Sequence, residues 1–232
     1  MMSKTKLAII TGGAKRIGAH LSRHLAENNW QLVIHYNESR EEAQLLHDTL
    51  SKKTQVSLIQ QDFSQDFNSK ELFQKIRSHH QIEPSLLINN ASSFNNEMLD
   101  DVTYHSFHKQ MNIMCLVPMM LSKQMKQGNI INIIDQYALE NHKNFTCHQI
   151  AKASLLKLTK QLAISLAPEV RVNALTLGPT MKGKNQKTFD DEIKKSLLGN
   201  AVRLEDICSS IDFLNKNESI TGQNIILDCG RI

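Results

Sequence analysis

Short apolar runs alternate with amphipathic segments along almost the whole chain. The apolar runs have the length of strands and lie at residues 7–11, 32–36, 56–60, 86–89, 130–134, 170–175 and 225–228. Helical spacing of apolar residues is found at 17–29, 39–52, 67–79, 101–125, 148–167 and 203–215. Apolar strands that alternate with helices indicate a parallel sheet covered on both faces. The pattern therefore predicts an α/β fold, a doubly wound Rossmann-type sheet of about seven parallel strands.

No break in composition and no internal repeat divides the chain, so residues 1–232 are expected to form a single domain. The segment 178–189 departs from the periodic pattern, because it is polar, rich in Gly and Lys, and aperiodic. It follows a predicted strand, and ligands bind at the carboxyl ends of the strands in such folds. This segment is therefore a candidate lid over the site.

The composition is that of an ordinary globular protein, with 41% hydrophobic and 22% charged residues in 232. The net charge of +4 is spread along the chain without a basic block, which argues against a nucleic-acid partner. No run approaches the ~20 apolar residues of a membrane span, and none near the N-terminus is long enough for a signal peptide. We therefore expect a cytoplasmic protein without a membrane partner.

Cysteine spacing gives no sign of a metal site. The cysteines are Cys115, Cys147, Cys208 and Cys229, and no two of them form a C-x-x-C pair. In a reducing cytosol such residues are expected to be free thiols.

A glycine-containing turn follows the first predicted strand. It reads TGGAKRIG from Thr11 to Gly18, and a helical pattern begins within it. Glycines there allow a tight turn and let the backbone approach a pyrophosphate at the N-terminus of the helix. The spacing is not the G-x-G-x-x-G of the dinucleotide fingerprint, so a plain strand–helix turn is the alternative.

The end of the second strand bears on the choice between NAD and NADP. An NAD site places a carboxylate there for the ribose 2′-hydroxyl, but this chain has Asn37. Lys15 and Arg16 in the glycine turn are suited to a 2′-phosphate. Glu38 favours the opposite choice, and Arg16 has the alternative of a solvated charge at a helix start. The pattern favours NADPH.

These residues resemble the short-chain dehydrogenase/reductase family over essentially the whole chain. The resemblance rests on the glycine turn and on Asp62, the Asn89–Ser92 run NNAS, Asn112, Lys152, the Arg171–Ala174 run RVNA, Gly178-Pro179-Thr180, and Thr221-Gly222-Gln223 followed by Asp228-Cys229-Gly230. It implies a homo-oligomer, a dimer or a tetramer. It also implies cofactor contacts from Thr11, Gly12, Gly13, Lys15, Arg16, Ile17, Gly18, His35, Tyr36, Asn37, Ser39, Asp62, Phe63, Asn90, Ala91, Ser92, Lys152, Gly178 and Pro179.

A narrower resemblance is to the pteridine reductase and dihydromonapterin reductase branch. It rests on Lys15-Arg16, His35-Tyr36, the run from Asn90 to Phe94, and Asp135. In that branch an aspartate replaces a catalytic serine, and a phenylalanine stacks the pterin against the nicotinamide. The resemblance assigns substrate contacts to Phe94, Asp135, His148 and Pro179. The alternatives are loop packing for Phe94 and a solvent-facing strand-end carboxylate for Asp135.

The chain departs from the family at the catalytic tyrosine, whose position holds His148. Leu177 replaces a proline and Glu38 an arginine of the family. In the family the tyrosine donates a proton, the lysine holds the nicotinamide ribose, and the asparagine steadies a relay water. Those last two roles are expected here for Lys152 and Asn112.

The spacing of His148 and Lys152 places both on one face of a helix. A neighbouring lysine disfavours the imidazolium, although Asp135, if close, would oppose that effect. An imine nitrogen is more basic than a carbonyl oxygen, so it can take its proton from water or from Asp135. We therefore expect His148 to face the nicotinamide pocket without being an essential acid.

The favoured interpretation is an NADPH-dependent reductase that converts a dihydropterin of the dihydromonapterin or dihydrobiopterin type, or dihydrofolate, to its tetrahydro form. In this interpretation Lys152 orients the cofactor, Phe94 stacks the pterin, and Asp135 and His148 handle the proton. One alternative is a generic carbonyl or 3-oxoacyl reductase. The other is a catalytically silent NADP(H)-binding protein, which the absence of the tyrosine favours.

Overall fold

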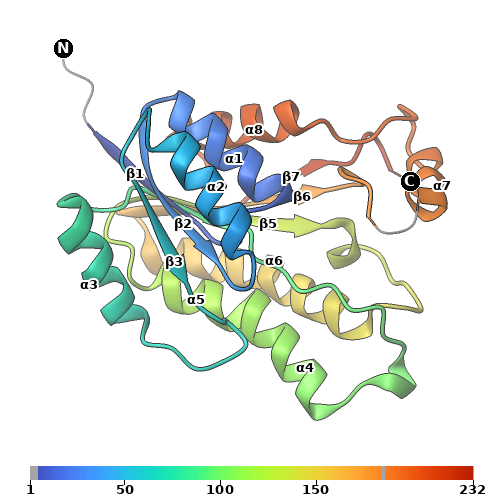
Figure 1. Cartoon of the computed structure of the whole chain (residues 1–232). Coiled ribbons are helices and arrows are strands. Elements are labelled where there is room, and N and C mark those ends of the chain that lie inside the picture. The colour runs from blue at the N-terminus through green and yellow to red at the C-terminus, as the bar shows by residue number, and fades with distance from the viewer. Residues whose placement is uncertain (1–4, 184–185, 232) are drawn as a thin grey trace.

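The computed structural model describes residues 5–183 and 186–231, and its centre is one parallel sheet of seven strands (Figure 1). The strand order is β3-β2-β1-β4-β5-β6-β7. The strands are β1 Lys6–Ile10, β2 Trp30–Tyr36, β3 Val56–Gln60, β4 Leu86–Asn89, β5 Gly128–Asp135, β6 Val170–Leu177 and β7 Asn224–Leu227. The predicted doubly wound fold is confirmed.

Helices cover both faces of the sheet, as Figure 1 shows. They are α1 Arg16–Glu27, α2 Arg40–Leu50, α3 Ser69–His80, α4 Tyr104–Met111, α5 Val117–Ser122, α6 Thr146–Leu166, α7 Gln186–Lys194 and α8 Leu204–Lys216. Shorter turns are the 3₁₀ turns η1 Leu99–Asp101 and η3 Gln136–Ala138 and the π turn η2 Asn112–Leu116. Helices α1, α2 and α8 pack on one face, and α3, α5 and α6 pack on the other.

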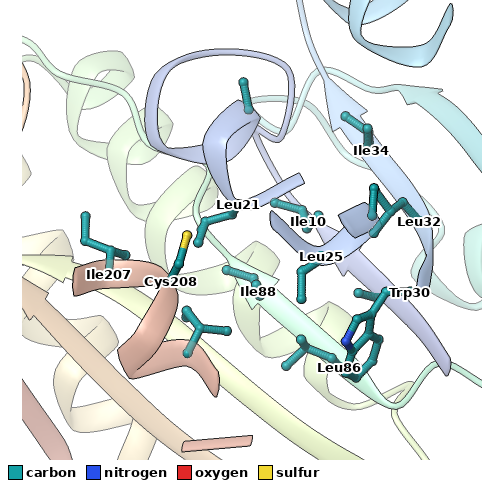
Figure 2. Close-up of a cluster of buried hydrophobic side chains, with 14 of the residues drawn as sticks. Ile10, Leu21, Leu25, Trp30, Leu32, Ile34, Leu86, Ile88, Ile207 and Cys208 are labelled. Atoms are coloured by element: carbon teal, nitrogen blue, oxygen red, sulfur yellow. The ribbon is translucent and has the colours of Figure 1, made fainter. Parts of the chain in front are cut away.

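Alternating side chains of the strands feed two cores, one on each face. In β1, Ala8 and Ile10 join the α1 side, whereas Leu7 and Ile9 join the α3 side. Figure 2 shows part of the first core, where Ile10 lies among side chains of α1, β4 and α8. A strand that is buried on both faces reads as a continuous apolar run, which is why the sequence pattern located these strands.

The observed secondary structure differs from the predicted pattern in two places. The single helix expected at 101–125 starts at Tyr104 instead, and the π turn η2 splits it into α4 and α5. Pro118 has no backbone N–H to donate to the preceding turn, which favours such a break. The aperiodic segment 178–189 is helical from Gln186, where α7 begins. Residues 184–185 of this candidate lid lie outside the described residues.

Candidate active site

The candidate site lies at the carboxyl ends of the strands, where the strand order reverses between β1 and β4. Two loops are tied together there. The hydroxyl oxygen of Thr11, after β1, accepts hydrogen bonds from the amides of Asn90 (2.9 Å) and Ala91 (3.0 Å), after β4. The Asn90 side-chain amide donates to the carbonyls of Thr11 (2.9 Å) and Gly12 (3.0 Å). These bonds fix the glycine turn against β4.

The glycine turn is tight enough to require glycine. A Cβ on Gly18 would lie 2.1 Å from the Gly12 carbonyl oxygen, and Gly12 has a φ of +60°. The N-cap of α1, Lys15, makes no side-chain capping bond, and the first turn of α1 holds no acidic residue. The N–H groups of that first turn are therefore free to bind an anion. This donor set fits the pyrophosphate of a dinucleotide.

His35 holds the glycine turn through a hydrogen bond with its backbone. Its Nδ1 accepts a hydrogen bond from the Gly12 amide (3.0 Å), and its Nε2 lies 2.9 Å from the Gln61 carbonyl oxygen, to which it donates. The ring stacks on Phe63 at 3.9 Å between centroids. Burial lowers the pKa of His35 to about 4, and the bond to Gln61 only partly opposes this. His35 is thus a neutral ring that acts on a cofactor site only through the turn.

The basic residues of the turn both have partners. Lys15 pairs with Glu42 of α2 at 2.5 Å. The Arg16 guanidinium donates to the carbonyls of Met181 and Lys182, each at 3.1 Å, so it joins the turn to the candidate lid. Arg16 also has a φ of +51°, which is unfavourable for any residue with a Cβ.

At the opposite side of the site, His148, Lys152 and Asp135 form one cluster. The His148 Nε2 lies 2.8 Å from Asp135 Oδ2, and the Lys152 Nζ lies 4.0 Å from the same oxygen. Lys152 also donates to the Ile133 carbonyl at 3.0 Å. The strand end of β5 supplies Asp135, and one face of α6 supplies the other two. The expectation that His148 and Lys152 share a face is confirmed.

The charges of the cluster depend on one another. Burial alone would raise the pKa of Asp135, but the hydrogen bond with His148 and the charge of Lys152 hold that pKa below its ordinary value. Burial lowers the pKa of Lys152, and Asp135 partly restores it. Asp135 is thus a carboxylate that is stabilised by its neighbours.

The three side chains differ in accessibility. The side chain of His148 is 1% exposed and that of Asp135 is 30% exposed. The second ring nitrogen of His148, Nδ1, lies 3.0 Å from the Ser93 carbonyl oxygen. The Tyr137 amide donates to Asp135 Oδ1 at 3.2 Å. A molecule that enters the site therefore meets Asp135 before it can reach His148.

Aromatic rings form the wall beside this cluster. Phe94 is 58% exposed and does not point into the core, which argues against loop packing as its role. Its ring centroid lies 4.6 Å from Phe145, 4.9 Å from His148 and 6.1 Å from Tyr137. The sequence interpretation missed Tyr137 and Phe145. Their closeness in sequence to Asp135 and His148 was the available signal.

The remaining predicted residues have mainly structural contacts. Asp62 accepts from the Ser64 amide at 2.8 Å, and this bond lowers the pKa of its carboxyl. Asn112 donates to the Ser64 carbonyl at 3.2 Å. Within the described part of the chain it has no hydrogen bond to the Asp135 cluster. Asn112 opens the π turn η2, which packs against α6, the helix that carries His148 and Lys152.

Other predicted cofactor residues follow the carboxyl ends of the strands. The Ser92 hydroxyl donates to the sulfur of buried Met114 at 3.3 Å. The Gly178 amide donates to the Leu227 carbonyl, and the Pro179 carbonyl accepts from Val202, both at 2.8 Å. Several further residues lie around the glycine turn and the end of β2, namely Gly13, Ile17, Tyr36, Asn37 and Ser39. Exposed Arg40, which begins α2 just after them, is a further basic candidate that the sequence interpretation missed.

Cys147 lies directly before His148 but does not contribute a reactive group. It is buried, and this burial, with the nearby Glu97 carboxylate, raises the pKa of its thiol to about 11. All four cysteines are free. Among residues 5–183 and 186–231 we find no group of His, Cys, Asp and Glu that could hold a metal, and no helix with the length and apolarity of a membrane span.

Comparison with known proteins places this geometry in a family. The family model described as enoyl-(acyl carrier protein) reductase matches residues 12–231. A dihydromonapterin reductase of Klebsiella pneumoniae is 25% identical, over 96% of this chain and 95% of the relative. A 7alpha-hydroxysteroid dehydrogenase of Bacteroides fragilis is 28% identical, over 98% of this chain and 94% of the relative.

Comparison with solved structures also finds a reductase. It is the FolM alternative dihydrofolate reductase 1 of Brucella canis complexed with NADP, with a TM-score of 0.91 and 28% identity. The match covers 97% of this chain and 93% of that one. The family model covers nearly the whole length of this chain. The chain belongs to the short-chain dehydrogenase/reductase superfamily, in the family described as enoyl-(acyl carrier protein) reductase.

Proposed function

We propose that this protein is an NADPH-dependent reductase of dihydropterins, which it converts to their tetrahydro forms. The substrate class includes dihydromonapterin, dihydrobiopterin and dihydrofolate. Relatives named for dihydromonapterin and dihydrofolate reduction support this class. The exposed ring of Phe94, 4.9 Å from the His148 ring, supports it independently, because a flat heterocycle can stack on such a ring.

The cofactor is NADP(H). The free N–H groups at the start of α1 suit its pyrophosphate, and Lys15 and Arg16 lie in the same turn. When bound, NADPH supplies the hydride. Lys152, buried and hydrogen-bonded to the end of β5, is a fixed ammonium that is suited to hold the nicotinamide ribose.

The observation that carries the proposal is that Asp135 is the partly exposed acid–base group of the cluster, whereas His148 is buried. Protonation of a ring nitrogen during C=N reduction needs a proton donor at the substrate, and a carboxyl group can fill that role. A ketone needs stabilisation of developing charge on oxygen, and the family donor for that purpose is replaced by His148. The cluster therefore suits an imine better than a ketone.

The test is oxidation of NADPH by the purified protein with dihydromonapterin or dihydrobiopterin, compared with a 3-oxoacyl thioester and an oxosteroid. Turnover only with the pterins supports the proposal. Faster turnover of the thioester or the oxosteroid would make the protein a carbonyl reductase, as the hydroxysteroid dehydrogenase relative suggests. Tight NADPH binding without any turnover would identify a silent NADP(H)-binding protein.

A further inference from the structure

His148 is held between two groups that can accept hydrogen bonds. Its Nδ1 lies 3.0 Å from the Ser93 carbonyl oxygen, and its Nε2 lies 2.8 Å from Asp135 Oδ2. A carbonyl oxygen can only accept, so Nδ1 carries a hydrogen. Rotating the ring by half a turn would place carbon atoms against both acceptors and lose both bonds. The ring orientation is therefore set by its two partners.

The contact with Asp135 requires one more hydrogen. A neutral ring that is protonated at Nδ1 has only a lone pair at Nε2, and a carboxylate has no hydrogen to donate. The hydrogen of the 2.8 Å contact lies either on Nε2 or on the carboxyl group. In both cases the pair holds one proton more than a neutral histidine beside a carboxylate.

The surrounding charges place that proton on the ring. The Lys152 ammonium, 4.0 Å from Asp135 Oδ2, stabilises the carboxylate, as does the Tyr137 amide. The phenol of Tyr137 also faces the pair from η3, with Glu192 of α7 and Arg231 acting on that phenol. The ring of His142 faces Tyr137 in turn, at 5.9 Å.

His148 and Asp135 differ in burial, and this difference gives them different roles. The His148 side chain is 1% exposed, and the edge of Phe94 approaches its ring, whereas Asp135 is 30% exposed. The imidazole cannot touch a molecule in the site in this arrangement, but the carboxyl group can. The proton on the ring therefore reaches a substrate by way of Asp135.

We propose that Asp135 is the residue that hands the proton to the substrate, and that His148 is a buried proton store that recharges it. This inference rests on the proposed function. The proton of His148 Nε2 moves to the Asp135 carboxylate, and the carboxyl group so formed passes a proton to the substrate nitrogen. This leaves His148 neutral, with its hydrogen on Nδ1, and Asp135 again a carboxylate. The C=N double bond becomes a single bond, with a new N–H bond from this proton and a new C–H bond from the hydride of NADPH. The pair then regains one proton from water at the exposed side of Asp135.

The first experiment measures the protonation of His148, by nitrogen-15 NMR of the histidine rings in the full chain without cofactor. Because both ring nitrogens face acceptors, we expect both nitrogens of His148 to carry hydrogens. In Asp135→Asn we expect a neutral ring. A neutral His148 in the unmodified protein overturns the proposal.

Two other buried histidines provide internal controls in the same spectrum. His80 lies between the Ser57 hydroxyl (2.8 Å) and the side-chain oxygen of Gln31 (2.9 Å), and His35 lies between an amide and a carbonyl. Each of these rings has one donor and one acceptor as neighbours, so each is satisfied when neutral. Burial lowers the pKa of both to about 4. Both must give neutral signals under conditions where His148 gives an imidazolium signal.

The second experiment measures pterin turnover in His148→Gln and Asp135→Asn. A general acid contributes about 10²–10⁴-fold, so we expect a kcat loss of that size for Asp135→Asn and a roughly tenfold loss for His148→Gln. The glutamine amide can still donate to Asp135 but stores no proton. We therefore expect the alkaline limb of its kcat profile to shift to lower pH, with the pterin KM nearly unchanged.

The outcomes separate the two proposals. An unchanged pH profile in His148→Gln, or a larger kcat loss there than in Asp135→Asn, would overturn the division of roles. An imidazolium signal from His148 in a protein that reduces no pterin would refute the proposed function but leave the proton store standing.

Discussion

Phe94 is the residue on which pterin binding is expected to depend. Its exposed ring faces the site beside His148, and stacking of aromatic rings contributes ~0.5–1.5 kcal/mol beyond burial of area. Phe94→Ala should therefore raise the pterin KM by roughly two- to twelvefold, which is the same free energy expressed as a ratio. The NADPH dissociation constant should stay nearly unchanged. Steady-state kinetics and a separate cofactor titration measure the two effects, and Phe94→Tyr, which keeps the ring, is the matched control. Equal weakening of pterin and NADPH would contradict this role.

Arg16 combines an unfavourable backbone conformation with a charge that is useful at the cofactor site. Its φ of +51° is readily adopted by glycine, whereas for a residue with a Cβ it costs about 1–2 kcal/mol. Arg16→Gly and Arg16→Ala both remove the guanidinium, but only the glycine variant relieves the strain. We expect Arg16→Gly to be about 1 kcal/mol more stable than Arg16→Ala in urea unfolding.

The same two variants test cofactor choice. Both variants should bind NADPH more weakly than the unmodified protein does and should bind NADH about as tightly as it does. The reason is that only NADPH carries the 2′-phosphate that pairs with a cation. Isothermal titration with each cofactor measures the difference. If the unmodified protein binds both cofactors equally, the preference for NADPH is wrong.

At the scale of elements, the turn between β1 and α1 depends on a neutral histidine. His35 accepts from the Gly12 amide, and its pKa in the folded protein is about 4 against an ordinary value of 6.5. The unfolded chain therefore binds a proton more readily, so stability is complete above pH 6.5 and is lost as the pH falls towards 4. The loss should approach about 1.4 kcal/mol for each pH unit in that window.

A variant separates His35 from other titrating groups. His35→Asn keeps an acceptor for the Gly12 amide but does not titrate, so its unfolding free energy should depend less steeply on pH between these limits. The exposed His105 on α4 offers a control, because His105→Asn should leave the pH dependence as it is. If the unfolding free energies of His35→Asn and the unmodified protein fall equally steeply with decreasing pH, the His35 ring does not cause the loss of stability in acid.

The elements that could be predicted from sequence are those in which the pattern of apolar residues is unbroken. The strands next to β1 are buried on both faces and appear as unbroken apolar runs, and the glycine turn has its own spacing. The break at η2 depends on a change in hydrogen bonding inside one amphipathic helix, which periodicity does not register. The spacing of His148 and Lys152 predicted a shared face. Only tertiary packing could place His148 behind Asp135 and against the Ser93 carbonyl.

At the scale of the whole molecule, one arginine near the C-terminus joins three segments. The buried Arg231 side chain pairs with Glu140, after η3, and with Glu192 on α7. The Gln136 amide donates to the same Glu192 at 3.2 Å. Arg231 thus fastens α7 to the loop that follows the Asp135 strand.

Removal of this arginine should release α7. Arg231→Ala leaves Glu140 without its arginine partner and leaves Glu192 with the Lys195 ammonium as its remaining cation among the described residues, and we expect roughly 1–3 kcal/mol of lost stability, less than for a fully buried pair. Limited proteolysis should then cut faster within residues 178–194. Arg203→Ala, which removes only an exposed pair with Asp206, should leave the cutting rate unchanged. Equal cutting in both variants would show that Arg231 does not hold α7.

The burial of Cys147 beside His148 has a consequence for how the protein withstands oxidants. The reactive form of cysteine is the thiolate, and burial raises the pKa of Cys147 to about 11, with raised values also for Cys115, Cys208 and Cys229. At neutral pH these thiols stay protonated, so peroxide and alkylating reagents find little thiolate to attack. We therefore expect the protein to tolerate oxidants and to react slowly with cysteine-directed reagents.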